Sequence, residues 1–284
     1  GKPSIHGLPE PLEALLRKGQ CRPAHRFEIA SGGCISHCYI VTCSSGQQYF
    51  FKSLEFPPDQ LFDAEVSGLQ ALAATKTIRV PRVISHSDNG LLMEYLPAER
   101  PGRGYWQLLG EQLAALHKYR ANGFGFSSDT YCGTTLQPNR LMADGHKFFI
   151  EKRLLFQATF AFDNQRLALA DLKQMECLCN KLHQLIPIQP ATLLHGDLWS
   201  GNQLCHQGQP VLFDPAVYWG WAEAELAMTR LFGGFPHAFY QSYFSHSEFQ
   251  PGWEERIAIY NLYHLINHLN IFNGKLFVYN FIIY

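Results

Sequence analysis

The side chains best suited to chemistry lie in residues 195–202, which read His-Gly-Asp-Leu-Trp-Ser-Gly-Asn. Asp197 is followed five residues later by Asn202, and Asp214 stands just after a short apolar run, residues 210–213. Phosphoryl transfer needs a base and oxygen ligands for Mg²⁺, because the reaction depends mostly on positioning and on neutralisation of charge. The pattern therefore predicts Asp197 as the catalytic base and Asn202 and Asp214 as metal ligands.

A simpler explanation exists for the same segment, since Asp, Ser, Gly and Asn also favour an ordinary turn between strands. Residues far upstream favour the catalytic interpretation. Lys52 lies in a predicted apolar strand, residues 48–53, and Glu65 lies in the helix predicted next along the chain. A lysine that contacts nucleotide phosphates and is held by a helix glutamate is the ion pair that kinases require.

Two further segments are predicted to bind ATP. Glycines let a backbone approach phosphates closely, and a glycine-rich turn before Lys52 contains Gly32, Gly33 and Cys34. This turn matches neither the Walker pattern nor G-x-G-x-x-G, so a plain hairpin turn is the alternative. A later apolar strand could pair its backbone with adenine, unless it is only a core strand. Its four candidate residues are Met93, Glu94, Tyr95 and Leu96.

The elements around these residues predict two lobes. Residues 1–96 are expected to form a nucleotide-binding lobe with a small antiparallel sheet (strands 35–42, 48–53, 79–85 and 90–95) and one helix, residues 61–74. A Pro/Gly-rich stretch, residues 97–104, marks a hinge. Residues 97–284 are expected to form a larger, mainly helical lobe with the catalytic, metal and acceptor residues; its predicted helices are 105–119, 147–162 and 164–185. The fold class is thus α+β.

Charge and composition restrict the partners. With 23 Lys and Arg against 24 Asp and Glu, the chain has no positive field that would attract nucleic acid or an anionic membrane. No apolar run approaches the ~20 residues that span a bilayer. We therefore expect a cytoplasmic protein, a monomer or weak homodimer, with neither a nucleic acid nor a membrane as partner.

The eight cysteines are scattered and form no C-x-x-C pair, so neither a disulfide framework nor a zinc ribbon is expected. Cys177, Cys179 and His183 resemble a metal site only superficially. They lie in a predicted helix, where side chains two positions apart point in different directions.

The order of these motifs resembles that of the kinase-like phosphotransferases, and more closely that of the fructosamine kinase (ketosamine-3-kinase) family. The phrases that carry the resemblance recur in order over almost the whole chain. They include Gly32-Gly33-Cys34-Ile35, Phe62-x-x-Glu65-x-x-Gly68-Leu69, Gly123-Phe124-Gly125, Gln137-Pro138-Asn139, Phe148-Phe149, Arg153-Leu154, residues 195–202, Asp214-Pro215-Ala216-Val217-Tyr218, Ala227-Met228-Thr229, residues 231–235, Leu262-Tyr263-His264 and Asn267-His268.

The resemblance implies a protein-kinase-like fold and an acceptor that is a ketosamine, a sugar joined through nitrogen to an amine or a protein lysine. It implies ATP-dependent phosphorylation of the sugar, at the 3-position, which destabilises the adduct and releases the amine in a deglycation-type repair. Trp199 and Trp219 are then expected to line the acceptor pocket, with plain core packing as the alternative.

Some positions depart from the family pattern. Residues 140–145 contain no Trp where the family is rich in it, Trp221 stands where His is common, and Glu225 where Asp is common. Because these changes spare the phosphotransfer residues, they put only the exact sugar in doubt.

One alternative function is that of a phosphotransferase for an aminoglycoside or amino alcohol, which an acidic acceptor pocket would favour. Another is a non-catalytic nucleotide-binding relative, although such relatives usually lack the base, the lysine or a metal ligand.

Overall fold

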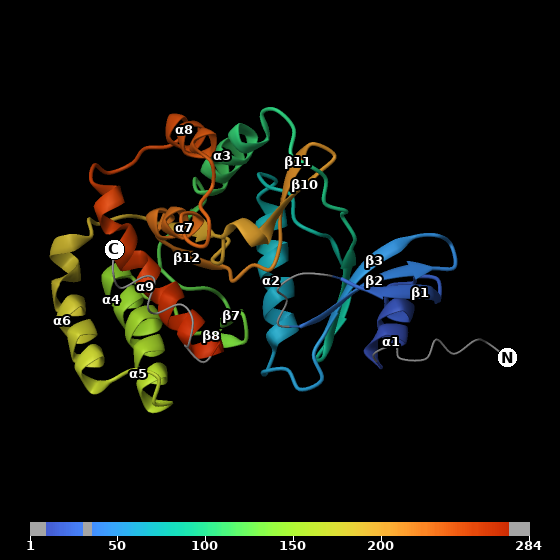
Figure 1. The fold of residues 1–284 in the computed structure, drawn as a ribbon, viewed down its shortest axis with the longest axis horizontal. Coiled ribbons are helices and arrows are strands. Elements are labelled where there is room, and N and C mark those ends of the chain that lie inside the picture. The colour runs from blue at the N-terminus through green and yellow to red at the C-terminus, as the bar shows by residue number, and fades with distance from the viewer. Residues whose placement is uncertain (1–9, 31–35, 273–284) are drawn as a thin grey trace.

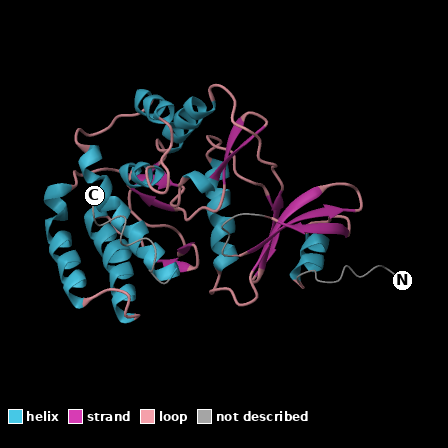
Figure 2. Cartoon of the chain, in the orientation of Figure 1, coloured by secondary structure: helices cyan, strands magenta, loops and turns pink. Residues whose placement is uncertain are grey.

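The chain folds into a small lobe built on a β-sheet and a larger, mainly helical lobe (Figures 1 and 2). The structure is a computed structural model that describes residues 10–30 and 36–272. It confirms the predicted α+β class and the two-lobed, protein-kinase-like arrangement. The division between residues 96 and 97 stays a prediction.

The small lobe contains a five-stranded antiparallel sheet with the order β1-β2-β3-β5-β4. Its strands are β1 (Ala24–Ile29), β2 (His37–Cys43), β3 (Gln48–Ser53), β4 (Val83–Ser87) and β5 (Gly90–Glu94). Helix α1 (Pro11–Lys18) packs on one face and helix α2 (Leu61–Ala74) on the other. The sheet thereby has one apolar core on each side.

Side-chain alternation along β3 decides which face Lys52 occupies. Phe51 is buried in the cluster that contains the leucines of α1, whereas Phe50 packs against the cluster that contains α2. Successive side chains of a strand point to opposite faces, so Lys52 points with Phe50 toward α2. Burial of the two phenylalanines on opposite faces thus aims the lysine at the cleft between the lobes.

Two elements of this lobe differ from the predicted ones. Strand β4 begins at Val83 instead of Arg79, because Pro81 has no N–H to donate to the sheet ladder. Helix α1 is absent from the predicted elements, although its leucines Leu12, Leu15 and Leu16 follow helical spacing and are buried.

The large lobe contains most of the helices. They are α3 (Tyr105–Leu116), α4 (Gly145–Phe149), a π-helical segment (Ile150–Leu154), α5 (Leu155–Asp163), α6 (Leu169–Leu185), α7 (Ala222–Thr229), α8 (His237–Ser245) and α9 (Trp253–Phe272). Three small sheets accompany them: β12-β9-β6 (Tyr218–Gly220, Ala191–Leu194, Arg120–Ala121), β7-β8 (Thr130–Cys132, Thr135–Gln137) and β10-β11 (Gln203–His206, Gln209–Leu212).

The helix predicted over residues 147–162 contains a π-helical segment at its centre. Arg153, inside that segment, is fully buried and donates to the carbonyl of Pro138 at 2.7 Å and to Asn139 Oδ1 at 2.6 Å. Its guanidinium also lies 4.1 Å from the centre of the Tyr218 ring, a cation–π contact. The π turn therefore places a buried cation where it holds the chain that follows the β7-β8 hairpin.

The predicted hinge, residues 97–104, is bonded to the β10-β11 hairpin. Glu99 N–H donates to Cys205 O at 2.7 Å, and the carbonyl of Pro97 lies 2.9 Å from His206 Nδ1. One hydrophobic cluster also includes residues of both lobes, such as Leu69 of α2 and Leu212 of β11.

Within the described residues, no helix is both long and apolar enough to cross a membrane.

Candidate active site

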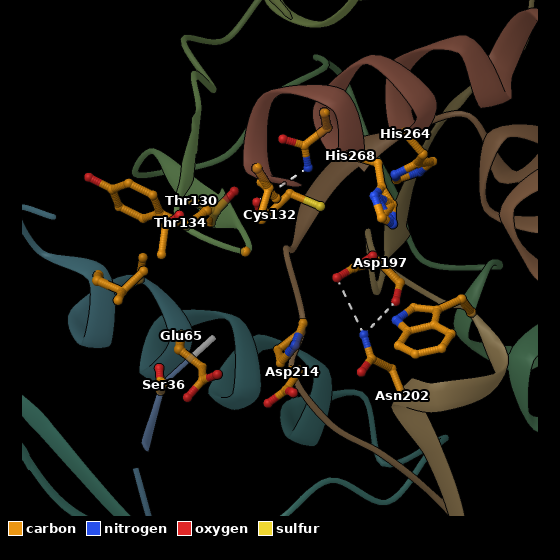
Figure 3. Close-up of a pocket in the computed structure, with 18 of the residues that line it drawn as sticks. Ser36, Glu65, Thr130, Cys132, Thr134, Asp197, Asn202, Asp214, His264 and His268 are labelled. Atoms are coloured by element: carbon orange, nitrogen blue, oxygen red, sulfur yellow. Dashed lines mark hydrogen bonds between the residues drawn. The ribbon is translucent and has the colours of Figure 1, made fainter. Parts of the chain in front are cut away.

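Two loops lie side by side at the base of the cleft. The first follows β9 and carries Asp197, and the second follows β11 and carries Asp214 (Figure 3). Strand β9 pairs with β12, and Ala216 N–H donates to His195 O at 2.8 Å. This close approach of the two backbones requires glycine at position 196, where φ is +92° and an added Cβ would lie 1.8 Å from Ala216 O.

His195 joins the two loops. Its Nδ1 accepts a hydrogen bond from Asp197 N–H at 3.1 Å, and its Nε2 lies 2.7 Å from Phe213 O. A carbonyl can only accept, so Nε2 carries the proton. Burial lowers the pKa of His195, which keeps the ring neutral and in this tautomer. A fixed imidazole therefore sets the spacing between the residues that precede Asp214 and the backbone of Asp197.

Glu225 of α7 anchors the first loop from behind. Its carboxylate accepts hydrogen bonds from the backbone N–H groups of His195, at 3.0 Å, and Gly196, at 2.8 Å. His117 Nε2 lies 2.8 Å from the same carboxylate and its Nδ1 lies 2.7 Å from the Tyr243 hydroxyl. Burial alone would raise the pKa of Glu225, but the hydrogen bonds and charge of His117 and the Gly196 N–H lower it overall. The carboxylate therefore stays ionised.

Asn202 lies beside the predicted base. Its side-chain amide donates to the carbonyl of Asp197 at 2.8 Å and to its carboxylate oxygen at 3.3 Å (Figure 3). These bonds use the amide nitrogen, and among the described residues no hydrogen bond engages the amide oxygen. The short 3-10 turn Ser200–Asn202 sets this orientation and leaves an oxygen ligand available in the cleft.

Lys52 connects the two lobes through two carboxylates. It forms ion pairs with Glu65 of α2 and with Asp214, the latter at 2.7 Å. Burial alone would lower the pKa of Lys52, but attraction by Asp214 and Glu65 outweighs burial and raises it well above its ordinary value. The ion pair predicted between Lys52 and Glu65 is thus present. Asp214 has φ +49°, a left-handed conformation that is uncommon outside glycine, so its orientation is a specified feature of the loop.

The carboxyl of Asp197 has an unusual environment for an aspartate. Burial and the nearby charge of Asp214 raise its pKa well above the ordinary value, and hydrogen bonding from Cys132 and Asn202 opposes this rise only in part. A carboxylate with a raised pKa is a stronger base, which suits proton abstraction from a hydroxyl.

A cavity of about 630 Å³ lies between the lobes and receives most of these side chains. Six predicted site residues line it: Lys52, Glu65, Asp197, Trp199, Asn202 and Asp214. The lining also includes Thr130, Cys132, Thr134, Phe232, His264, His268 and Phe272. The structure therefore brings the predicted base, metal ligands, ion pair and one tryptophan to a single cavity.

Other predicted site residues are placed differently. Gly32, Gly33 and Cys34 lie outside the described residues. Met93, Glu94, Tyr95 and Leu96 are not among the residues that line the cavity. Met93 is buried in the core, and the Glu94 carboxylate pairs with Arg79 and the Arg82 N–H. Within residues 10–30 and 36–272, the backbone N–H of Leu96 has no hydrogen-bond partner.

Trp219 is also absent from the lining of the cavity. It lies in β12, its backbone exchanges hydrogen bonds with Gly125, and its ring packs against the two main hydrophobic clusters. This placement matches the alternative expectation for that residue, plain core packing. Trp199, by contrast, lies two residues after the predicted base, edge-on to Phe232 in the cavity.

Several lining residues carried no predicted role. Thr130, Cys132 and Thr134 belong to the β7-β8 hairpin, which the predicted elements lack because its strands are only three residues long. His264 and His268 lie one turn apart on α9. Their motifs belong to the family resemblance, yet a histidine in a helical apolar pattern gives no sign by itself that it faces a cleft.

The described cysteines of α6 agree with the rejection of a zinc site there. Cys177 is exposed and Cys179 is buried, so their side chains leave the helix in different directions.

Comparison with known proteins yields a consistent set of relatives. The sequence profile described as fructosamine kinase matches residues 14–281. The "Probable ketoamine kinase" of Synechocystis sp. is 42% identical over 279 residues, covering 94% of this chain and 93% of that protein. A chloroplastic protein-ribulosamine 3-kinase of Arabidopsis thaliana is 34% identical, covering 92% of this chain and 82% of that protein.

Solved structures show the same fold. The crystal structure of a proposed fructosamine-3-kinase from Thermobifida fusca superposes with a TM-score of 0.88 at 29% identity and covers 97% of both chains. An ADP-bound aminoglycoside phosphotransferase, at 16% identity, superposes with a TM-score of 0.60 and covers 95% of this chain and 93% of that one. The second likeness concerns the fold alone.

Glu225→Gln is expected to destabilise the protein by about 2–4 kcal/mol, because an amide offers one acceptor oxygen and leaves a buried backbone N–H unsatisfied. Urea unfolding followed by circular dichroism measures the change. Glu111→Gln, at an exposed position of α3, is the matched control and is expected to change stability by less than about 0.5 kcal/mol. Equal stability of the two variants would contradict the anchoring role of Glu225.

Proposed function

The chain belongs to the fructosamine kinase family, and from that premise we propose that it transfers the terminal phosphoryl group of ATP to the 3-hydroxyl of a ketosamine sugar. The observation that carries the proposal is the convergence of Lys52, Asp197 and Asp214 on one cavity that also contains an aromatic wall. Phosphoryl transfer requires such a set, and a ketosamine supplies both a hydroxyl and a sugar face.

The donor atoms in the cavity fit Mg²⁺, the ion that we propose as cofactor. The amide oxygen of Asn202 is available, and the Asp214 carboxylate offers an oxygen beyond the one that pairs with Lys52. Mg²⁺ prefers oxygen ligands and is usually bound by one or two carboxylates together with substrate phosphates. When bound, the ion would neutralise charge on the phosphates. Asn202 and Asp214 would hold it.

Each protein side chain then has a separate task in the reaction. Asp197 accepts the proton of the sugar hydroxyl. The hydroxyl oxygen attacks the terminal phosphorus of ATP, and the bond from that phosphorus to ADP breaks. Lys52, held by Glu65, is placed to pair with nucleotide phosphates. His195 and Glu225 act only through the backbone of the loop, so they are positioning residues.

The nucleotide base is proposed to bind where β5 leaves the sheet, at residues Met93, Glu94, Tyr95 and Leu96. The support is the backbone N–H of Leu96, which has no partner in the part of the chain that the structure describes. An adenine ring nitrogen is an acceptor that would satisfy it. Gly32, Gly33 and Cys34 are proposed to contact the phosphates on sequence grounds alone.

The acceptor side of the cavity favours a sugar over a polycation. Its described lining includes the rings of Trp199, Phe232 and Phe272, and burial lowers the pKa of both His264 and His268, which keeps them neutral. The acidic lining residues are Glu65, Asp197 and Asp214, and phosphotransfer already assigns a role to each of them. An aminoglycoside would need further carboxylates for its ammonium groups. We therefore propose Trp199, and not Trp219, as the acceptor wall.

The cytoplasmic location and the monomeric or weakly dimeric state expected from the sequence stay predictions.

The reaction is tested by Mg²⁺-dependent ADP release with a panel of acceptors: fructosamines, ribulosamines, aminoglycosides and choline. Turnover is expected with the ketosamines alone. Asp197→Asn is expected to lower kcat by about 10²- to 10⁴-fold, the usual contribution of a general base. ADP release confined to an aminoglycoside or choline would overturn the acceptor class and leave the phosphotransfer assignment intact.

The acceptor wall is tested by Trp199→Leu, which is expected to raise KM for the ketosamine about tenfold and to leave KM for ATP nearly unchanged. Gly201→Ala should reproduce the effect, because its added Cβ would lie 2.1 Å from the Trp199 ring and displace it. Gly102→Ala, where nothing lies within 4 Å of the added Cβ, is the control. A rise in KM for ATP alone would place Trp199 on the nucleotide side.

The pH dependence of kcat/KM tests the state of the base. Because the pKa of Asp197 is raised, activity is expected to fall with decreasing pH at a value clearly above the ordinary aspartate pKa of about 3.9. Cys132→Ala removes a hydrogen bond that lowers the pKa of Asp197. The acid limb of the kcat/KM profile of this variant should therefore move to higher pH. A limb that stays in place, or moves to lower pH, would contradict the assigned environment.

A further inference from the structure

Three side chains able to bind a metal, one of them that of Asp197, lie close together in the cavity. Phosphoryl transfer does not require this arrangement. The sulfur of Cys132, a carboxylate oxygen of Asp197 and an imidazole nitrogen of His264 all lie within 4.8 Å of one another. They come from three separate elements: the end of β7, the loop after β9, and α9. Figure 3 shows Cys132 and His264 on the same side of the cavity as Asp197.

The donor set identifies the class of ion. One sulfur, one nitrogen and one oxygen suit Zn²⁺ and similar divalent transition metals, whereas Mg²⁺ selects oxygen ligands. Tetrahedral zinc with bonds of about 2.0–2.3 Å keeps its ligand atoms roughly 3.3–3.8 Å apart. Because the three atoms lie within 4.8 Å of one another, they need to approach by at most about 1.5 Å to bind the ion.

Local structure allows that approach. Cys132 ends its strand at the turn that begins with Gly133, whose φ is +66°. His264 forms no hydrogen bond with any residue in the ranges 10–30 and 36–272, so no group in those ranges competes for its ring nitrogens. Burial lowers the pKa of His264 to about 3, and the neutral ring has a lone pair for a metal.

We propose that Cys132, Asp197 and His264 form an inhibitory site for Zn²⁺. The ion occupies the carboxylate that must accept the proton of the sugar hydroxyl, and it stands where that hydroxyl must approach. Binding replaces the proton of the Cys132 thiol, which passes to the buffer, and water supplies the fourth ligand. Because burial raises the pKa of this thiol well above its ordinary value, release of the proton makes binding stronger as pH rises.

Metal binding is tested without ATP, by titrating the full chain with Co²⁺, a spectroscopic substitute for Zn²⁺. The wild type is expected to take up one equivalent and to show thiolate-to-cobalt charge-transfer absorption. Cys132→Ser should abolish the band, and His264→Gln should weaken binding at least about tenfold. Cys34→Ser and Cys177→Ser are matched controls that should retain the band. Its absence from the wild type, or its persistence in Cys132→Ser, would overturn the site.

Inhibition is tested by initial rates at saturating Mg²⁺ and ATP in buffered Zn²⁺. We expect the inhibition by zinc to be relieved by the ketosamine and not by ATP. The inhibition constant, measured against the zinc-free rate of each variant, should rise at least about tenfold in Cys132→Ser and His264→Gln. Equal inhibition of wild type and Cys132→Ser would place the inhibitory ion elsewhere.

The two measurements separate this inference from the proposed function. Co²⁺ binding needs no turnover, so a protein that binds one cobalt through Cys132 but phosphorylates no ketosamine would retain the site and lose the function. Thermal unfolding of each variant controls for misfolding. If His264→Gln does not fold, the result for Cys132→Ser decides the matter, because serine is nearly isosteric with cysteine.

Discussion

The buried carboxylate of Glu225 accepts hydrogen bonds from the backbone N–H groups of His195 and Gly196, and the position of the loop that carries Asp197 depends on them. A buried carboxylate is costly unless donors surround it, so the loop and the carboxylate stabilise each other. His117, the residue that follows α3, lies 2.8 Å from the same carboxylate, and Tyr243 of α8 holds the other nitrogen of the His117 ring. Three helices of the large lobe thereby determine where Asp197 stands.

The second constraint is the short distance between the loops that carry Asp197 and Asp214. His195 connects them through its ring, and Gly196 lets their backbones touch. Lys52 then ties Asp214 to the small lobe, because alternation along β3 aims this lysine at the cleft. Burial, together with the nearby charge of Asp214, explains the raised pKa of Asp197. Geometry and basicity therefore have the same origin, two carboxylates that share one buried space.

The proposed base and metal ligands could be named from the sequence because residues 195–202 and Asp214 form a local motif. Strand β3 and helix α2 match their predicted bounds. The other parts of the fold and of the candidate site depend on contacts between segments that are distant in the sequence. Three-residue strands such as β7 have too few side chains for the alternation of apolar and polar residues to be recognised. Cys132 was therefore not predicted to lie in the cavity. Trp219 could not be told from a pocket residue, because an aromatic strand residue packs in a core or lines a cleft with the same sequence signature.

In the proposed reaction, Asp197 directs the phosphoryl group of ATP to a sugar hydroxyl of a ketosamine. Phosphorus-31 NMR recorded during the reaction with a simple fructosamine, before the product breaks down, shows where the phosphate goes, and proton correlation locates it on the sugar. The wild type is expected to form a sugar phosphomonoester on the 3-carbon in a one-to-one ratio with ADP, and Asp197→Asn is expected to form it at least about 10²-fold more slowly. Early spectra that contain ADP and inorganic phosphate without any sugar phosphomonoester would overturn this assignment, because the sugar would then not be the acceptor.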